Sequence, residues 1–194
     1  MAEVKGILLT AWVDFIKNRY GAQVVGQAIL TLEAADHSLV SAPFLASSWY
    51  PYETLNALRK LTRGLATPAD QNLSIEIGRN MAAHVFTGAY RTLVGKTPAN
   101  QVEKITWIKD FFFKDSLIME TEMLSESSCL VRYRYDPGAI PTHSICESLS
   151  GFWSQTLELA GAATIKASHQ KCAAKSADCC EFVFAWQGTV VGGR

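Results

Sequence analysis

The stretch 144–186 constrains the fold most, because it joins one helical pattern to two alternating patterns. Ser144 and Glu147 have the spacing of a capping box, and apolar residues then recur at helical spacing, which predicts a helix. Apolar and polar residues alternate in 163–169, and they alternate again in 180–186. This stretch is therefore predicted to fold as a helix followed by two antiparallel strands that are buried on one face.

The residues before this stretch predict helices first and a hairpin second. Helical spacing of apolar residues indicates five helices before residue 115, of which the longest runs over 67–94. Residues 34–48 are polar and contain Pro43, so a loop is expected there. Alternation in 117–123 and 129–135 predicts the hairpin. The order of five helices, a hairpin, a helix and a hairpin defines an α+β fold.

No repeat, low-complexity segment or linker divides the chain of 194 residues, which is long enough for one hydrophobic core. A single domain is predicted over 1–187, and the Gly-rich segment 188–194 is predicted to be a flexible tail.

Charge and hydropathy narrow the expected partners and location. The chain has 18 basic and 18 acidic residues, so neither nucleic acid nor an anionic membrane is an expected partner. No apolar run reaches the roughly 20 residues needed to cross a bilayer, and the first residues lack the pattern of a signal peptide. A cytoplasmic protein without membrane insertion is expected, in which the five cysteines are free or bind metal.

Cys146, His169, Cys172 and Cys180 are candidate metal ligands. Cys146 lies in the first turn of the predicted helix, while strand alternation directs His169 and Cys180 toward that helix. Packing the helix on the hairpin could bring the four side chains together as a Cys3His set, which is typical of structural zinc sites. The alternative is that the cysteines are small buried residues and that His169 hydrogen-bonds to backbone.

The order of these residues resembles the end of a 4-vinyl-reductase (V4R) domain, on the pattern Cys146, Gly151, Gly161, Cys172, Cys180 and Phe182. The cysteine spacings are also similar to those of zinc-binding phenol-sensor domains of bacterial activators, a branch of that family. Those domains have a glutamate where this chain has His169. The resemblance implies a bound zinc ion and a homodimer.

The start of the chain is similar to the opening of haem nitric-oxide-binding (H-NOX) domains, through 4–6, Phe15 and 19–21. H-NOX domains share an α+β fold with V4R domains and with Bet3-type subunits of vesicle-tethering complexes. Together with 49–51 and 78–79, the pattern looks most like a protein family abundant in myxobacteria. These resemblances span nearly the whole chain.

Three functions follow from the resemblance. The first is a non-enzymatic sensor or regulatory domain for a small hydrophobic ligand, and the second is a protein-interaction module with a packed core. A haem-based gas sensor is the disfavoured third, because H-NOX domains need a histidine on the helix before the strands and a Y-x-S-x-R motif. Residues 97–114 contain no histidine, and 133–137 read YRYDP, so no haem is expected.

The chain shows no pattern typical of an enzyme. It lacks a Gly-rich phosphate loop after a strand and a G-x-S-x-G elbow. Glu120 and Glu122 alternate with apolar residues, and cross-strand pairing with Arg132 and Arg134 is expected instead of acid–base chemistry.

Aromatic residues of the middle helices are the candidate walls of a ligand pocket. His84 lies on the apolar stripe of the longest predicted helix, where it could hydrogen-bond a ligand hydroxyl. Trp107, Phe111 and Trp153 are the predicted walls beside it. The alternative is that His84 is a hydrogen-bonded core residue and that the aromatic rings fill the core.

Overall fold

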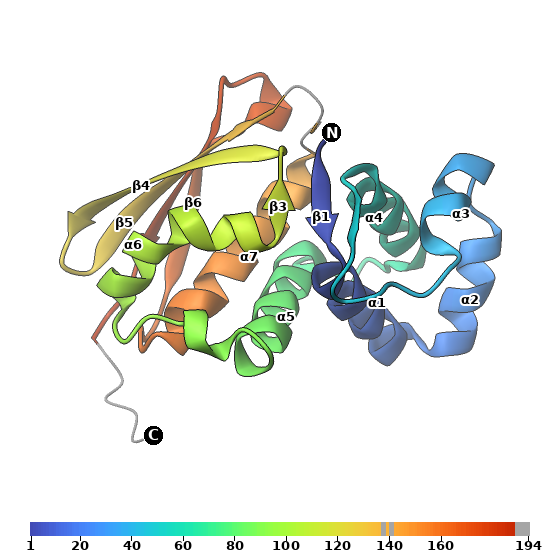
Figure 1. Cartoon of the computed structure of the whole chain (residues 1–194), viewed down its shortest axis with the longest axis horizontal. Coiled ribbons are helices and arrows are strands. Elements are labelled where there is room, and N and C mark those ends of the chain that lie inside the picture. Colours follow the sequence, from blue (N-terminus) through green and yellow to red (C-terminus); the bar gives the residue numbers. More distant parts are fainter. Residues whose placement is uncertain (137–138, 140–141, 189–194) are drawn as a thin grey trace.

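A computed structural model describes residues 1–136, 139 and 142–188 of the chain. Figure 1 shows α1 to α4 gathered at one end of the molecule and the larger sheet at the other, with α5 and α7 between them. The helices are α1 (Gly6–Tyr20), α2 (Ala22–Leu30), α3 (Ala34–Val40), α4 (Glu53–Leu65), α5 (Leu73–Thr87), α6 (Pro98–Ile108) and α7 (His143–Leu159). The 3-10 turns are η1 (Arg91–Leu93), η2 (Lys109–Phe111) and η3 (Ala173–Lys175).

The larger sheet is antiparallel and has the strand order β4-β5-β7-β6. Its strands are β4 (Leu117–Ser125), β5 (Ser128–Tyr135), β6 (Lys166–Lys171) and β7 (Cys180–Ala185). Each predicted hairpin forms, and the two hairpins join where Val131 of β5 pairs with Phe182 of β7. The predicted α+β fold, with two hairpins and an intervening helix, is confirmed.

Strand alternation decides which face of this sheet is buried. Val131, Tyr133, Phe182 and Phe184 have at most 1% of their surface exposed, and they lie on the inner face, which α6 and α7 cover (Figure 1). The outer face carries most of the charged residues of the sheet, together with Ile118, Leu130 and Val183, as the alternating sequence predicts.

A second antiparallel sheet, with the order β2-β1-β3, joins distant parts of the chain. Its strands are β1 (Glu3–Lys5), β2 (Trp49–Pro51) and β3 (Phe113–Lys114). The sequence analysis missed this sheet, because strands of two or three residues are too short to show alternation. Val4 of β1 is fully buried, so the short sheet is part of the core.

Helices α5 and α7 cross with their backbones in contact. A Cβ atom placed on Gly78 of α5 would lie 1.8 Å from the carbonyl oxygen of Ser148, and one on Gly151 of α7 would lie 2.1 Å from that of Ile75. Any side chain at either glycine would force the helices apart. This crossing joins the helical end of the molecule to the sheet end.

Three details of the helices differ from expectation. Residues 34–40 form α3 instead of a loop, since Pro43 lies beyond the segment that becomes helical. The predicted helix 67–94 is divided, because α5 ends at Thr87 and η1 follows. Helix α7 begins at His143, where Thr142 Oγ1 accepts a hydrogen bond from the Ile145 N–H at 3.4 Å, and not at the predicted cap Ser144.

The predicted flexible tail, apart from Gly188, lies outside the described residues. In the part of the chain that is described, no helix has both the length and the apolarity required to cross a bilayer.

Candidate metal centre

The structure brings the predicted Cys3His set together on the inner face of the larger sheet. Cys146 comes from the first turn of α7, His169 from β6, Cys172 from the residue after β6, and Cys180 from the start of β7. Their donor atoms all lie within 4.8 Å of one another, and the Sγ atoms of Cys146 and Cys180 are 3.3 Å apart. Four donors of this type at such separations suit one tetrahedral zinc ion.

His169 is held with one ring nitrogen buried and unsatisfied. Its ring stacks on Phe182, with centroids 4.0 Å apart and an interplanar angle of 15°. The His169 Nε2 atom is buried and has no hydrogen-bond partner among the described residues. Because a buried polar atom without a partner is costly, a metal ion at the cluster would remove that cost.

The two closest thiols have opposite shifts in acidity. The Cys146 thiol beside it, and the Ala173 N–H at 3.2 Å from its Sγ atom, hold the pKa of Cys180 below that of a free cysteine. The same contact with Cys180, together with burial, raises the pKa of Cys146. The cluster is therefore arranged to hold at least one thiolate, which is the form that binds metal.

Three tyrosines that the sequence did not point to lie near the thiols, the buried Tyr52 and Tyr133 and the partly buried Tyr135. The hydroxyl of Tyr135 lies 3.5 Å from Cys146 Sγ. Those of Tyr52 and Tyr133 are buried without a hydrogen-bond partner in the described chain. Burial raises the pKa of all three, so they remain neutral, and the Tyr135 hydroxyl lies close enough to donate to a thiolate at Cys146. Alternation places Tyr133 in the core but carries no signal for its hydroxyl.

His143 is a further residue that the sequence analysis missed. Its Nδ1 atom is 3.6 Å from Cys172 Sγ, and its ring is stacked on His169 at a centroid distance of 5.6 Å. Its Nε2 atom is 3.6 Å from a carboxylate oxygen of Glu147, one helical turn further along α7. His143 thus lies beside the cluster and also lines a cavity of 410 Å³. Because the helix was predicted to begin at Ser144, His143 was expected to lie outside it and was not a candidate ligand.

The predicted pocket residues do not come together. His84 is in line with the buried Ile77 by helical spacing, but in the last turn of α5 only Val85 and Phe86 are covered, and His84 is exposed. The interpretation that His84 lies on a buried stripe is therefore wrong. Trp153 is fully buried in the core, with its ring 5.0 Å from that of Phe152.

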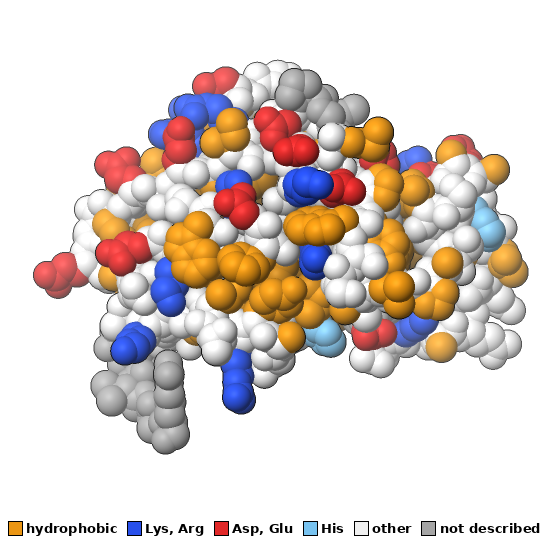
Figure 2. Space-filling model, viewed as in Figure 1, with side chains coloured by type: hydrophobic (Ala, Val, Ile, Leu, Met, Phe, Trp, Pro, Cys, Tyr) orange, Lys and Arg blue, Asp and Glu red, His pale blue; other side chains and the backbone are white. Residues whose placement is uncertain are grey.

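Trp107 and Phe111 lie on the surface, with 43% and 41% of their area exposed. Helix α6 continues into η2, and the two rings pack edge to face on the outer side of this turn, with their centroids 5.8 Å apart. Phe111 also contacts Tyr90 at 6.3 Å. Figure 2 shows apolar side chains gathered on the face of the molecule that carries α6. The expectation that Trp107 and Phe111 wall an interior pocket is wrong.

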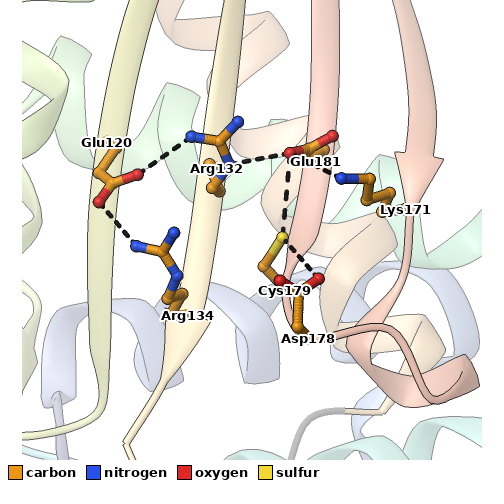
Figure 3. A network of polar contacts seen from close by, with 7 residues as sticks. All are labelled: Glu120, Arg132, Arg134, Lys171, Asp178, Cys179 and Glu181. Carbon is orange, nitrogen blue, oxygen red and sulfur yellow. Dashed lines mark hydrogen bonds and ion pairs between the residues drawn. The ribbon is translucent and has the colours of Figure 1, made fainter.

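The outer face of the larger sheet carries a chain of ion pairs (Figure 3). Glu120 accepts hydrogen bonds from Arg134 at 2.7 Å and from Arg132 at 3.2 Å. Arg132 also donates to Glu181 at 2.8 Å, and Lys171 lies 3.3 Å from the same carboxylate. The predicted cross-strand pairing of Glu120 with the two arginines is present.

No family model and no curated protein matches the chain. Solved structures do match. An H-NOX protein from S. oneidensis in the Fe(II) state is 16% identical, with 96% of this chain and 98% of that chain covered and a TM-score of 0.73. An unliganded Fe(II) H-NOX protein from K. algicida is 14% identical, with 97% and 100% covered and a TM-score of 0.69.

These comparisons define the class of the fold, which is H-NOX-like. At identities of 16% or below they show the fold alone. The V4R and myxobacterial resemblances gain no support from them.

The comparisons correct the expectation that haem is absent. The similar S. oneidensis structures were solved in Fe(II) and Fe(II)NO ligation states, and another study of this fold concerns haem distortion in the H-NOX family. The expectation that no haem is bound, which rested on the sequence alone, is therefore contradicted by the H-NOX proteins that share this fold.

The residues of α6 indicate whether this helix could offer an axial ligand to haem iron. The buried residues of α6 include Val102, Ile105 and Ile108, and none of its residues is a histidine. The rings of Phe112 and Phe152 lie 6.2 Å apart in the core beside it. Helix α6 supplies no axial ligand of the kind that haem iron takes, so the function proposed below has no step through haem.

Proposed function

We propose that the chain is a non-enzymatic, cytoplasmic sensor domain for a small hydrophobic ligand, with zinc at the Cys3His cluster. The observation that carries the proposal is the convergence of four donor atoms within 4.8 Å, one of them a ring nitrogen of His169, whose Nε2 atom is buried without a partner in the described chain. The H-NOX-like fold supports a role in sensing, because one of the similar structures comes from work on H-NOX activation. A homodimer is part of the proposal.

Zinc would act here as a structural cross-link. Bound to Cys146, it would tie the first turn of α7 to β6 and β7, which carry His169 and Cys180. Since a structural site is rarely preformed in the unfolded chain, zinc binding would add directly to the stability of the fold. The metal ligands would fix the position of α7 against the sheet. Helix α7 is also the element on which a bound ligand would act.

Elemental analysis and native mass spectrometry of protein purified without chelators test this proposal. We expect one zinc ion per chain, a dimeric mass, and loss of the metal in the Cys172→Ser variant. Protein that is folded and free of zinc, and that takes none up on titration, would contradict the metal assignment.

An interaction module is a second candidate, favoured by the surface position of Trp107 and Phe111. Contiguous exposed aromatic side chains often mark binding surfaces. Light scattering of the Phe111→Ser variant tests whether this aromatic surface carries the contact between two copies of the chain. Loss of the dimer without loss of zinc would assign this surface to self-association.

Haem binding is a third candidate, favoured by the similar structures. Absorption spectra of protein produced with added haem precursor provide the test. A stoichiometric Soret band would replace the zinc-based proposal by a haem-based one.

A further inference from the structure

We infer that a cavity between α4 and the start of α7 binds a small carboxylate with an apolar body. This inference rests on the proposed sensor function and names the class of its ligand. The cavity has a volume of 410 Å³ and is bounded by α1, α4, α5 and the first turn of α7. That volume lies in the range of small-molecule sites, which is about 300–1,000 Å³.

One side of the cavity is apolar. Trp12, Leu73 and Ile77 line it, and each has at most 7% of its surface exposed. The Trp12 Nε1–H group already donates to Thr62 Oγ1 at 2.9 Å. The indole therefore presents its ring to the cavity and needs no polar partner from a ligand. This side suits an aromatic or aliphatic group.

The opposite side is positively charged. Arg59 and Arg63 lie one turn apart on α4, and both line the cavity. Within the described ranges of the chain, neither arginine forms an ion pair, and the buried Arg59 Nε atom has no hydrogen-bond partner. A guanidinium group binds a carboxylate through two parallel hydrogen bonds.

The start of α7 adds to the positive side. Thr142, His143 and Ser144 line the cavity where this 17-residue helix begins. The N-terminal end of a helix carries partial positive charge and amide groups without helical partners, both of which favour an anion. Two arginines and a helix terminus thus converge on one cavity.

The acidic residues of the cavity do not cancel this charge. Asp70 is engaged by Arg19 and accepts a hydrogen bond from the Thr67 N–H at 2.7 Å, and these contacts hold its pKa below the usual value. Glu147 lies 3.6 Å from His143. Asp70 is therefore neutralised by Arg19, whereas His143 neutralises Glu147 only when its imidazole is protonated. Two arginines without ion pairs still outnumber the one remaining carboxylate of the cavity.

The position of the cavity connects it to the metal cluster. His143 lines the cavity and lies 3.6 Å from Cys172 Sγ. A carboxylate bound by Arg59 at the start of α7 would therefore be separated from the metal cluster by His143 alone. This arrangement fits a sensor in which ligand and metal act on the same helical turn.

Isothermal titration of the full chain with 2-naphthoate tests the inference, and the neutral 2-naphthamide is the matched ligand. We expect 2-naphthoate to bind with a sub-millimolar Kd and at least about tenfold more tightly than the amide. The Arg59→Met/Arg63→Met variant should lose about 10-fold to 100-fold in affinity for 2-naphthoate only. Arg91→Met, which changes an arginine in another cavity, should leave the affinity unchanged.

Three results would overturn the inference. These are no binding of 2-naphthoate, equal binding of the acid and the amide, or equal loss of affinity in the Arg91→Met control. Zinc content is measured on the same samples. Zinc-loaded protein that fails to bind 2-naphthoate overturns only the ligand class, while zinc-free protein that binds it overturns only the metal assignment.

Discussion

The two faces of the larger sheet hold neighbouring cysteines in opposite surroundings. Cys180 belongs to the inner cluster of thiols and imidazole, whereas Cys179 lies on the outer side, where its Sγ atom is 3.4 Å from a carboxylate oxygen of Asp178. The pKa of Cys180 is lowered by its thiol neighbour, while burial and Asp178 raise that of Cys179.

This difference shows how one sheet separates two kinds of chemistry. The inner face offers soft donor atoms in a site with little water, which suits a metal ion. The outer face pairs exposed charges, and such pairs contribute little to stability. Residue type alone does not decide the role of a cysteine here, because the face of the strand decides it.

The largest test of the comparison replaces one cysteine on each face. Cys172→Ser should lose zinc. Its free energy of unfolding should be about 4–5 kcal/mol below that of the unchanged, zinc-loaded protein, which corresponds to a fall of about 10 °C in Tm. Cys179→Ser should keep its zinc and its Tm. Calorimetry with metal analysis checks both variants, and similar losses in both would erase the distinction between the faces.

The next test concerns packing around His169. Phe182→Leu removes the ring that stacks on His169, with centroids 4.0 Å apart, and that contacts Tyr133 edge to face, with centroids 5.5 Å apart. We therefore expect a loss of about 1–2 kcal/mol in the free energy of unfolding. Val183→Leu, at the next position and on the outer face, should change stability by less than about 0.5 kcal/mol. Urea unfolding measures both variants. A larger effect at Val183 would contradict the assignment of the inner face.

A smaller effect is expected on the outer face. Arg132→Met removes the cation shared by Glu120 and Glu181, so Tm should fall by a few degrees at low salt. Because salt screens exposed charges, the difference from the unchanged protein should shrink in 1 M NaCl, where the screening length is about 3 Å. A difference that persists in high salt would indicate packing by the arginine stem as its cause.

The smallest effect is a dependence on pH. Arg134 and Arg132 lower the pKa of Glu120, and Arg132 with Lys171 lowers that of Glu181. Such carboxylates stabilise the fold above the unfolded pKa of about 4.3 and lose that contribution as the pH falls through the lower folded value. In zinc-free protein, the stability difference between Arg132→Met and the unchanged chain should therefore shrink below about pH 4. Urea unfolding across pH 3–7 measures it.

The sequence predicts the C-terminal half well, because long elements repeat their pattern. Alternation over β5 and β7 places Tyr133 and Phe182 on the same face, and both are buried as expected. The same alternation, with the first turn of α7, brings Cys146, His169 and Cys180 together. The meeting of these three residues could therefore be predicted from spacing, whereas Cys172 follows β6, where no alternation fixes its direction.

The pocket could not be predicted in the same way. His84 was chosen by helical spacing, and Trp107 and Phe111 were chosen as large aromatic residues of the middle helices. Neither criterion shows where a helix ends or which side its last turn leaves open. The cavity beside Arg59 depends on how α4 meets the start of α7, and that contact joins residues about 80 positions apart. Local patterns carry no information about such packing.

The glycine crossing of α5 and α7 couples the two helices mechanically. Because the backbones touch at Gly78 and Gly151, no compressible side chain lies between them to absorb a displacement. A displacement of the first turn of α7 would therefore be expected to move α5 with it, since the two helices are in direct backbone contact at these two positions.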